Sequence, residues 1–292
     1  MKTKTIALLG IALIGGSTAF AQKSKVISAF NYNKSFQRDK DCSELKKGIA
    51  AIESAANESS TNTWAKTYYY GGNLYFNALT AAPEECRASI PNALDKSMEF
   101  YTKMLKYNVE DNESIKNADL NTEAGRAMLK NVISNKQTKY EDSDWHRDVM
   151  GYKIPVMANA YINKGVEAFQ NKDPKGALEN FETSMYLTEL NNRIDTLAIY
   201  NSALAAENSQ QYDKALKYYS KLIELNHEGA KVYGYKAALY RKMGDTTSAV
   251  ATIQEGRKAY PEDKALIIEE LDYYLQTGKS VEALKNLDLA IS

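Results

Sequence analysis

The sequence of 292 residues is poor in the residues that bind metals or interrupt helices. It contains only two His and two Cys, whereas a structural zinc site needs about four such ligands. We therefore expect no metal site and no cofactor. Gly (15) and Pro (5) are also scarce. Because both residues destabilise a helix interior, their scarcity favours long helices over short strands joined by turns.

The sequence also lacks an excess of charge of either sign. Lys and Arg together number 37, as do Asp and Glu, whereas a nucleic-acid-binding domain needs a basic excess on one face. We therefore expect no nucleic-acid partner. The sequence contains no glycine-rich phosphate loop, Gly-x-Ser-x-Gly turn or His-Glu-x-x-His motif. We name no catalytic residues and expect that the protein is not an enzyme.

Apolar runs long enough to cross a membrane are absent. Residues 6–14 are mostly apolar, follow two Lys, and precede an Ala-Phe-Ala triplet that ends at Ala21. This run is shorter than the roughly 20 residues of a membrane span, which argues against an N-terminal anchor. The pattern predicts a signal peptide over residues 1–21, cleaved between Ala21 and Gln22. Because Gln22 is not Cys, we expect no lipid attachment and a periplasmic or secreted protein that does not span a membrane.

The two Cys would then lie in an oxidising compartment, where a disulfide persists. A bridge between Cys42 and Cys86 would stabilise the fold by roughly 3–4 kcal/mol in the chain-entropy model. The alternative is two separate buried Cys. The sequence leaves both open, because a bridge requires the two Cα atoms to lie within about 7 Å.

A repeated pattern runs through the second half of the chain. Its most regular positions are four Ala: Ala177, Ala215, Ala249 and Ala283. The last three follow one another at intervals of about 34 residues, and the first interval is slightly longer. Four residues after each Ala comes a large side chain: Phe181, Tyr219, Ile253 and Leu287. Small residues let paired helices approach, and large ones fill the space between them. Since one pair cannot bury its apolar side alone, the pairs must stack.

The pattern resembles the tetratricopeptide repeat (TPR) family, whose unit is a helix–turn–helix of about 34 residues. The segment from Gly244 to Pro261 is the closest match. The resemblance implies an all-α, right-handed solenoid of stacked antiparallel helix pairs. It covers residues 158–292 as an array of about four repeats, and residues 40–157 more loosely, as a degenerate helical-repeat region with an insertion. We expect a flexible N-terminal segment over residues 22–39.

As a whole, the sequence resembles exported TPR proteins of Bacteroidetes type. In that family, one face of the first helix of each pair lines a concave groove that receives peptides or partner helices. On this sequence the resemblance places these residues on that face: Tyr69, Asn73, Phe76, Asn159, Ile162, Phe169, Tyr200, Glu207, Asn208, Lys231, Arg241, Lys242, Ile268, Asp272 and Gln276. Three of them, Lys231, Arg241 and Lys242, would form a basic spot for a carboxylate or an acidic segment. The alternative is a solvated charged face.

A polar cluster over residues 144–148 is the strongest candidate for chemistry. One interpretation makes His146 and a carboxylate a general acid–base pair. The other, which we favour, is a surface connector, because nothing nearby in the sequence supplies a nucleophile or an oxyanion donor.

The expected function is a non-catalytic periplasmic scaffold or adaptor that binds protein partners through the TPR groove. The alternative is an envelope-associated binding protein for a nutrient or glycan. The sequence stops at Ser292 without a polar capping helix, which solenoids usually need for solubility. We expect either a truncated array, with the C-terminal cap missing, or end-to-end self-association through the uncapped last repeat.

Overall fold

The computed structural model describes the backbone of residues 23–291 and the side chains of residues 23–287. The predicted signal peptide and its cleavage point lie outside these residues. The described part is helical, with one isolated β-bridge between Val109 and Tyr140 and no strands. It divides into two compact units. Unit 1 runs to Met157 and includes residues 189–192, and unit 2 comprises the rest.

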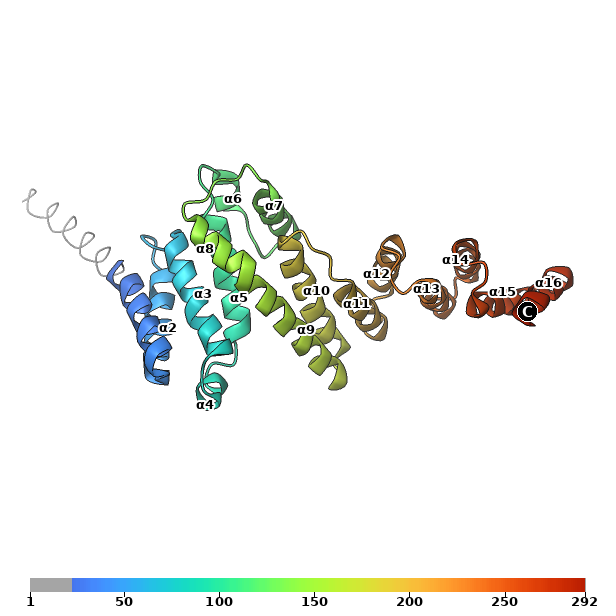
Figure 1. The fold of residues 1–292 in the computed structure, drawn as a ribbon, viewed down its shortest axis with the longest axis horizontal. Coiled ribbons are helices and arrows are strands. Elements are labelled where there is room, and N and C mark those ends of the chain that lie inside the picture. Colours follow the sequence, from blue (N-terminus) through green and yellow to red (C-terminus); the bar gives the residue numbers. More distant parts are fainter. Residues whose placement is uncertain (1–22, 292) are drawn as a thin grey trace, which may run out of the picture. The chain divides into compact units, whose positions relative to one another are not determined.

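Unit 1 contains the irregular part of the chain. A helix spans residues 23–39. The elements that follow are α2 (Cys42–Ala56), α3 (Ala65–Thr80), α4 (Glu84–Ala88), α5 (Ala93–Tyr107), α6 (Glu113–Asn117), α7 (Glu123–Ser134), α8 (Ser143–Asp148), the π-helix η1 (Val149–Lys153) and the start of α9 (Ile154–Gln170) (Figure 1). Helices α3 and α5 pack tightly against each other. A Cβ atom on Gly71 would lie 2.1 Å from the Phe100 ring, so only Gly permits this approach.

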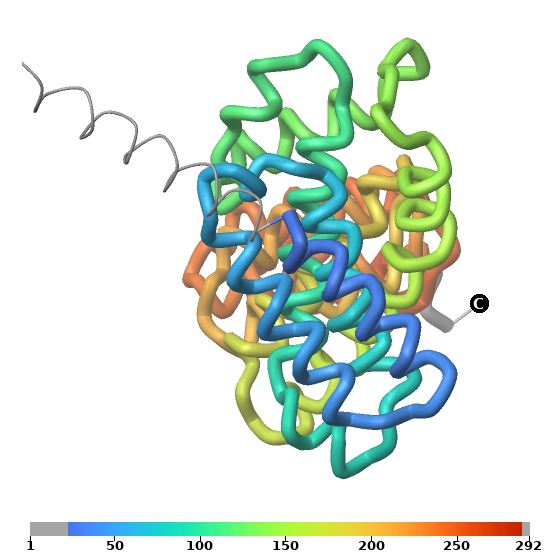
Figure 2. Tube along the Cα trace, turned by 90° about the vertical axis from the view of Figure 1, so that its left-hand side faces the viewer, coloured from blue at the N-terminus to red at the C-terminus, as the bar shows by residue number. Residues whose placement is uncertain are grey.

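Residues 23–39 are not the flexible segment that we expected. They form a helix beside α2 (Figure 2), and Lys25 donates a hydrogen bond to Ser54 of α2. The helix buries Val26, Ala29 and Phe36. These apolar residues recur at three- and seven-residue intervals, which is the helical period. The burial of this apolar side therefore orders the segment.

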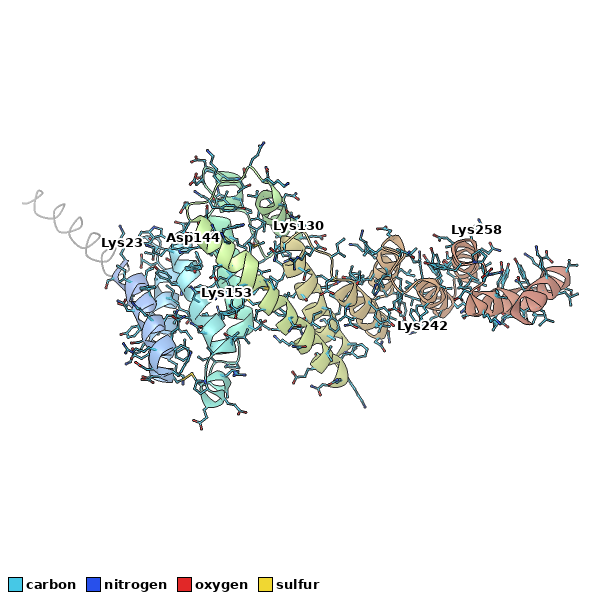
Figure 3. The ribbon with its side chains drawn as sticks, viewed as in Figure 1. Lys23, Lys130, Asp144, Lys153, Lys242 and Lys258 are labelled. Atoms are coloured by element: carbon cyan, nitrogen blue, oxygen red, sulfur yellow. A yellow bond between two sulfur atoms is a disulfide. The ribbon has the colours of Figure 1, made fainter. Side chains whose placement is uncertain are left out.

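A disulfide joins Cys42, at the start of α2, to Cys86 in α4, with the two Cα atoms 5.6 Å apart (Figure 3). The bond ties the predicted insertion to the first helix pair. Its position within unit 1 means that it constrains only this half of the chain.

The helix from α8 through η1 into α9 is continuous, and its π-turn has a cause in the sequence. Pro155 has no N–H to donate to the carbonyl of Gly151, and its ring crowds that carbonyl. The helix therefore widens over Val149–Lys153, directly before Pro155.

Unit 2 consists of α9 from Ala158 onward and seven further helices, the first of them up to Thr188. These are α10 (Pro174–Leu190), α11 (Thr196–Asn208), α12 (Tyr212–Glu224), α13 (Ala230–Lys242), α14 (Thr246–Ala259), α15 (Lys264–Gln276) and α16 (Ser280–Ile291). They form four helix pairs, and a turn of three residues joins the helices of each pair. Such short connections make the paired helices antiparallel. The expected all-α, TPR-like stack of helix pairs is therefore the fold of this unit.

The repeat positions form the core of unit 2. The four Ala of the pattern are all buried, as are Phe181, Tyr219 and Ile253. One core cluster joins helices α9 to α13, and a second joins α12 to α15. Each pair therefore packs on the next, as stacking requires.

Candidate functional site

The residues that the sequence assigns to a binding face in unit 2 do share one side of their helices. In α13, for example, Val232, Ala237 and Leu239 are buried, and the residues of the opposite side are more exposed. We call this side of the first helix of each pair the first-helix face. It contains Asn159, Ile162 and Phe169 of α9; Tyr200, Glu207 and Asn208 of α11; Lys231, Arg241 and Lys242 of α13; and Ile268, Asp272 and Gln276 of α15. All are exposed except Ile162, Tyr200 and Glu207, which are half-buried.

Contacts between neighbouring first helices connect this face. The rings of Tyr200 in α11 and Tyr235 in α13 lie 6.2 Å apart. Lys242 of α13 lies 3.4 Å from Glu207 of α11 (Lys242 is labelled in Figure 3). Arg241 of α13 lies 2.6 Å from Glu269 of α15. Helices α11, α13 and α15 therefore lie side by side and present one surface.

The sequence interpretation missed apolar residues of the same face. Leu197 of α11 and Leu275 of α15 are 56% and 63% exposed, and Ile268, which was predicted, is 55% exposed. Val166 of α9 and Tyr235 of α13 are also exposed. The helical spacing in the sequence could have identified them. Val166 lies four residues after Ile162, and Leu197 lies three residues before Tyr200, so each shares a side of its helix with a predicted residue.

The exposed apolar residues are unevenly distributed in unit 2. Between residues 158 and 279, every exposed large apolar side chain lies on a first helix or directly beside one. The last second helix, α16, is the exception, because its Val281, Leu284 and Leu287 are exposed. The second helices α10, α12 and α14 contribute none. Contiguous exposed apolar surface on one side of a protein marks interaction sites.

The expected basic spot is not formed. Lys231 is ten residues before Arg241 on α13, which separates them by about 15 Å along the helix axis. Lys231 lies 3.6 Å from Glu228, and Arg241 and Lys242 are each paired with a carboxylate of a neighbouring helix. Lys231 is therefore separated from the other two cations, and each of the three is compensated by a carboxylate.

Hydroxyl groups beside these pairs stay uncharged. The buried Tyr219 hydroxyl donates to Glu207, 3.0 Å away. Burial, together with the negative charge of Glu207, holds the pKa of Tyr219 far above its usual range. Burial and the hydrogen bond to Tyr235 raise the pKa of Tyr200 to about 12. At neutral pH this part of the face carries opposite charges in pairs and neutral tyrosines.

The three predicted residues of unit 1 do not lie on an open surface. The ring of Tyr69 stacks on Trp145 of α8 at 4.8 Å, and its hydroxyl lies 3.1 Å from Asp148. Phe76 is only 2% exposed. The Lys153 ammonium lies 4.5 Å from the centre of its ring.

Asn73 accepts a hydrogen bond from the hydroxyl of the buried Tyr101. The helix of α8 and η1 thus covers this side of α3, and we correct the assignment of Tyr69, Asn73 and Phe76 to a groove. They were misassigned because the sequence pattern does not reveal which helix covers α3.

His146 has the surroundings of a structural residue. Its ring stacks on Tyr140 at 3.8 Å, and its buried Nδ1 has no hydrogen-bond partner among the described residues. Burial lowers its pKa. A general base is usually oriented by a hydrogen-bonded partner, so this geometry favours the connector interpretation.

A pocket of about 320 Å³ lies in unit 1 between two loops, residues 109–112 and 135–139. Its lining is mostly polar, whereas small-molecule sites are mostly apolar. Among the described residues, no three His, Cys, Asp or Glu side chains are grouped to hold a metal ion. Nor is any described helix both long and apolar enough to cross a bilayer.

No family model and no curated protein matches the sequence. Among solved structures, a TPR repeats protein from Bacteroides fragilis is 29% identical, with a TM-score of 0.38 over 46% of this chain and 61% of that one. MamA is 17% identical (TM-score 0.38; 59% and 90% covered). The TPR2AB domain of yeast Sti1, in a complex with an HSP90 peptide, is 17% identical (TM-score 0.31; 94% and 98% covered). Because these TM-scores are below 0.5, the fold assignment rests on the helix pairs themselves.

Proposed function

We propose that this protein is a non-catalytic adaptor that binds another protein through the first-helix face of unit 2. The observation that carries the proposal is the uneven distribution of exposed apolar side chains, which lie on the first helices and not on α10, α12 or α14. Burying Leu197, Ile268 and Leu275 against a partner would remove apolar surface from water, and this favours association.

We further propose that the protein is exported to the periplasm, as in the Bacteroidetes-type TPR proteins that its sequence resembles. The predicted signal peptide over residues 1–21 supports export. The disulfide between Cys42 and Cys86 supports it independently, because disulfides persist in oxidising compartments. No feature of residues 23–291 favours the alternative of nutrient or glycan binding.

End-to-end self-association through the last repeat is a separate proposal, and the exposed side of α16 supports it. Leu287 is 41% exposed, whereas Phe181, at the same repeat position in α10, is only 2% exposed. Leu284 is likewise exposed, whereas its equivalent, Leu178, is buried. In earlier pairs a following helix covers these positions, so an apolar helix of a second copy would fit here.

Affinity capture tests the adaptor function. The bait is the mature chain from Gln22, compared with a Leu197→Glu/Ile268→Glu variant in a periplasmic extract of the source organism. The control is Ala251→Glu, which places a charge on the exposed side of α14. We expect a protein that the wild type and the control retain and the double variant loses. Equal retention by all three baits would contradict the proposal.

A further inference from the structure

The segment that carries α4 is attached to the rest of unit 1 by few polar contacts. We call residues 82–91, between α3 and α5, the α4 segment, and Figure 1 shows α4 beyond the ends of these two helices. Arg87 donates a hydrogen bond to the Ala82 carbonyl, and the Ser89 hydroxyl donates to that of Cys86. Both bonds stay within the segment. Among the described residues, no hydrogen bond or ion pair joins the α4 segment to α2. The disulfide is thus the only bond between them in this part of the chain.

One side of the α4 segment is buried. Ala82, Cys86 and Ile90 are at most 8% exposed and follow one another at a helical spacing of four residues. The opposite side carries exposed charged residues, among them Glu84 and Arg87. A helix of five residues is too short to be stable by itself. The α4 segment therefore keeps its place through a small apolar contact, its two chain connections and the disulfide.

The two sulfur atoms of the disulfide differ in access. A thiolate opens a disulfide by attacking one sulfur and displacing the other, so access helps to select the sulfur that is attacked. Cys86 is only 3% exposed. Cys42 is the first residue of α2, is half-buried, and lies between the exposed Asp41 and Ser43. A thiol can therefore reach the Cys42 sulfur more readily than the Cys86 sulfur.

Charge does not reverse this preference. A helix N-terminus stabilises a thiolate, which by itself would favour Cys42 as the leaving group. The carboxylate of Asp41, however, already accepts hydrogen bonds from the backbone N–H and the hydroxyl of Ser43, and these bonds lower the pKa of Asp41. Its negative charge, next to Cys42, opposes a thiolate there. Two Glu directly precede Cys86 and act in the same way. Access therefore decides which sulfur is attacked.

We propose that the disulfide is a redox latch, which holds the α4 segment closed and which a thiol opens by attack at Cys42. The incoming thiolate forms a new S–S bond with the Cys42 sulfur. The bond between Cys42 and Cys86 breaks, its electron pair leaves with the Cys86 sulfur, and this sulfur takes up the proton that the incoming thiol has lost. A second thiol then displaces the first from Cys42. The two thiols are thereby oxidised to a disulfide, and both Cys are reduced.

Opening the latch frees the α4 segment and leaves the helices around it packed. Helices α3 and α5 stay together, because Gly71 of α3 allows the Phe100 ring of α5 to approach closely. The buried side of the α4 segment, with Ala82 and Ile90, becomes exposed to solvent. Local openings of this kind require less free energy than global unfolding. The latch stays closed in an oxidising compartment and opens where thiols are supplied.

Trapping the mixed disulfide tests the point of attack. The mature wild-type chain reacts with glutathione for short times, and N-ethylmaleimide then blocks the free thiols. Since Cys42 and Cys86 are the only Cys of the sequence, mass spectrometry of the peptides locates both labels. We expect glutathione on Cys42 with N-ethylmaleimide on Cys86, in at least threefold excess over the reverse pair. Equal amounts, an excess of glutathione on Cys86, or no reaction of the folded chain would overturn the proposal.

Limited proteolysis tests the local opening. Trypsin cleaves after Arg87 in the α4 segment and after Arg147 of α8, and both residues are exposed and belong to unit 1. In Cys42→Ala/Cys86→Ala, the ratio of cleavage after Arg87 to cleavage after Arg147 should rise at least tenfold, because cleavage follows the population of the opened segment.

The variant must match the wild type in circular dichroism. If it does not, the wild-type chain opened by glutathione replaces it. An unchanged ratio would show that the α4 segment does not open separately from the rest of unit 1, and the latch would be refuted. Because the latch lies in unit 1, this result would leave the proposed binding face of unit 2 unaffected.

Discussion

The same side of a first helix is covered in one unit and exposed in the other. In unit 1, the side of α3 that carries Tyr69 and Phe76 lies under α8 and η1. In unit 2, the corresponding sides of α11 and α15 leave Leu197 and Ile268 more than half exposed. A position in a repeat thus becomes core or binding surface according to what packs on it. Both faces contain apolar residues, so composition does not separate them.

Truncating one residue on each face should give the largest difference in the free energy of unfolding. Phe76→Ala removes a buried ring, and we expect it to lower the free energy of unfolding by about 3–5 kcal/mol. Leu197→Ala removes an exposed side chain and should change it by less than about 0.5 kcal/mol. Urea titration followed by circular dichroism measures both. Similar losses at the two positions would contradict the distinction.

Removing the disulfide should weaken unit 1 alone. We expect Cys42→Ser/Cys86→Ser to lower the free energy of unfolding of this unit by roughly 3–4 kcal/mol in the chain-entropy model. Both Trp residues, Trp64 and Trp145, lie in unit 1, so their fluorescence follows its unfolding separately. The helical signal that remains after the Trp transition reports unit 2, and its midpoint should not move. A shift of both transitions would contradict this account.

The exposed side of α16 predicts an effect on association and not on stability. If two copies meet there, Leu284→Glu should convert the dimer or larger assembly to monomer, because it places a charge in an apolar contact. Sedimentation velocity at several protein concentrations measures this, with Ala251→Glu as the control. A wild-type chain that is monomeric at all concentrations would exclude the self-association.

A small effect is expected from removing the paired cations. Arg241→Ala/Lys242→Ala removes two surface ion pairs, each worth about 0–1 kcal/mol. The free energy of unfolding should therefore change by at most about 2 kcal/mol, and the change should shrink as salt is added, because salt screens exposed ion pairs. A loss several times larger, measured by urea titration, would mean that these pairs hold the first helices together.

Much of unit 2 could be predicted from the sequence, because its fold depends on local, repeated positions. Ala249 and Ile253, for example, identify a helix pair from its own sequence, and the identity of the next pair is not needed. The covering of Tyr69 could not be predicted in this way. It depends on α8, whose Asp148 lies 79 residues further along the chain than Tyr69, and no repeat relates the two segments.

The pairing of the cations could not be predicted from the sequence either, because it depends on residues that are far apart in the chain. Lys242 and Glu207 are 35 residues apart, and only the stacking of α11 and α13 brings them together. By contrast, the helix over residues 23–39 was open to prediction. Its buried Val26, Ala29 and Phe36 follow the helical period.

Photocrosslinking in the source organism tests most directly the claim that the open face of unit 2 binds a partner. A photoreactive phenylalanine analogue replaces Leu197 in one strain and Ala251, on the outside of α14, in another. We predict a crosslinked adduct with a second protein from position 197 and none from position 251. Equal adducts from both positions, or none from position 197, would contradict the account.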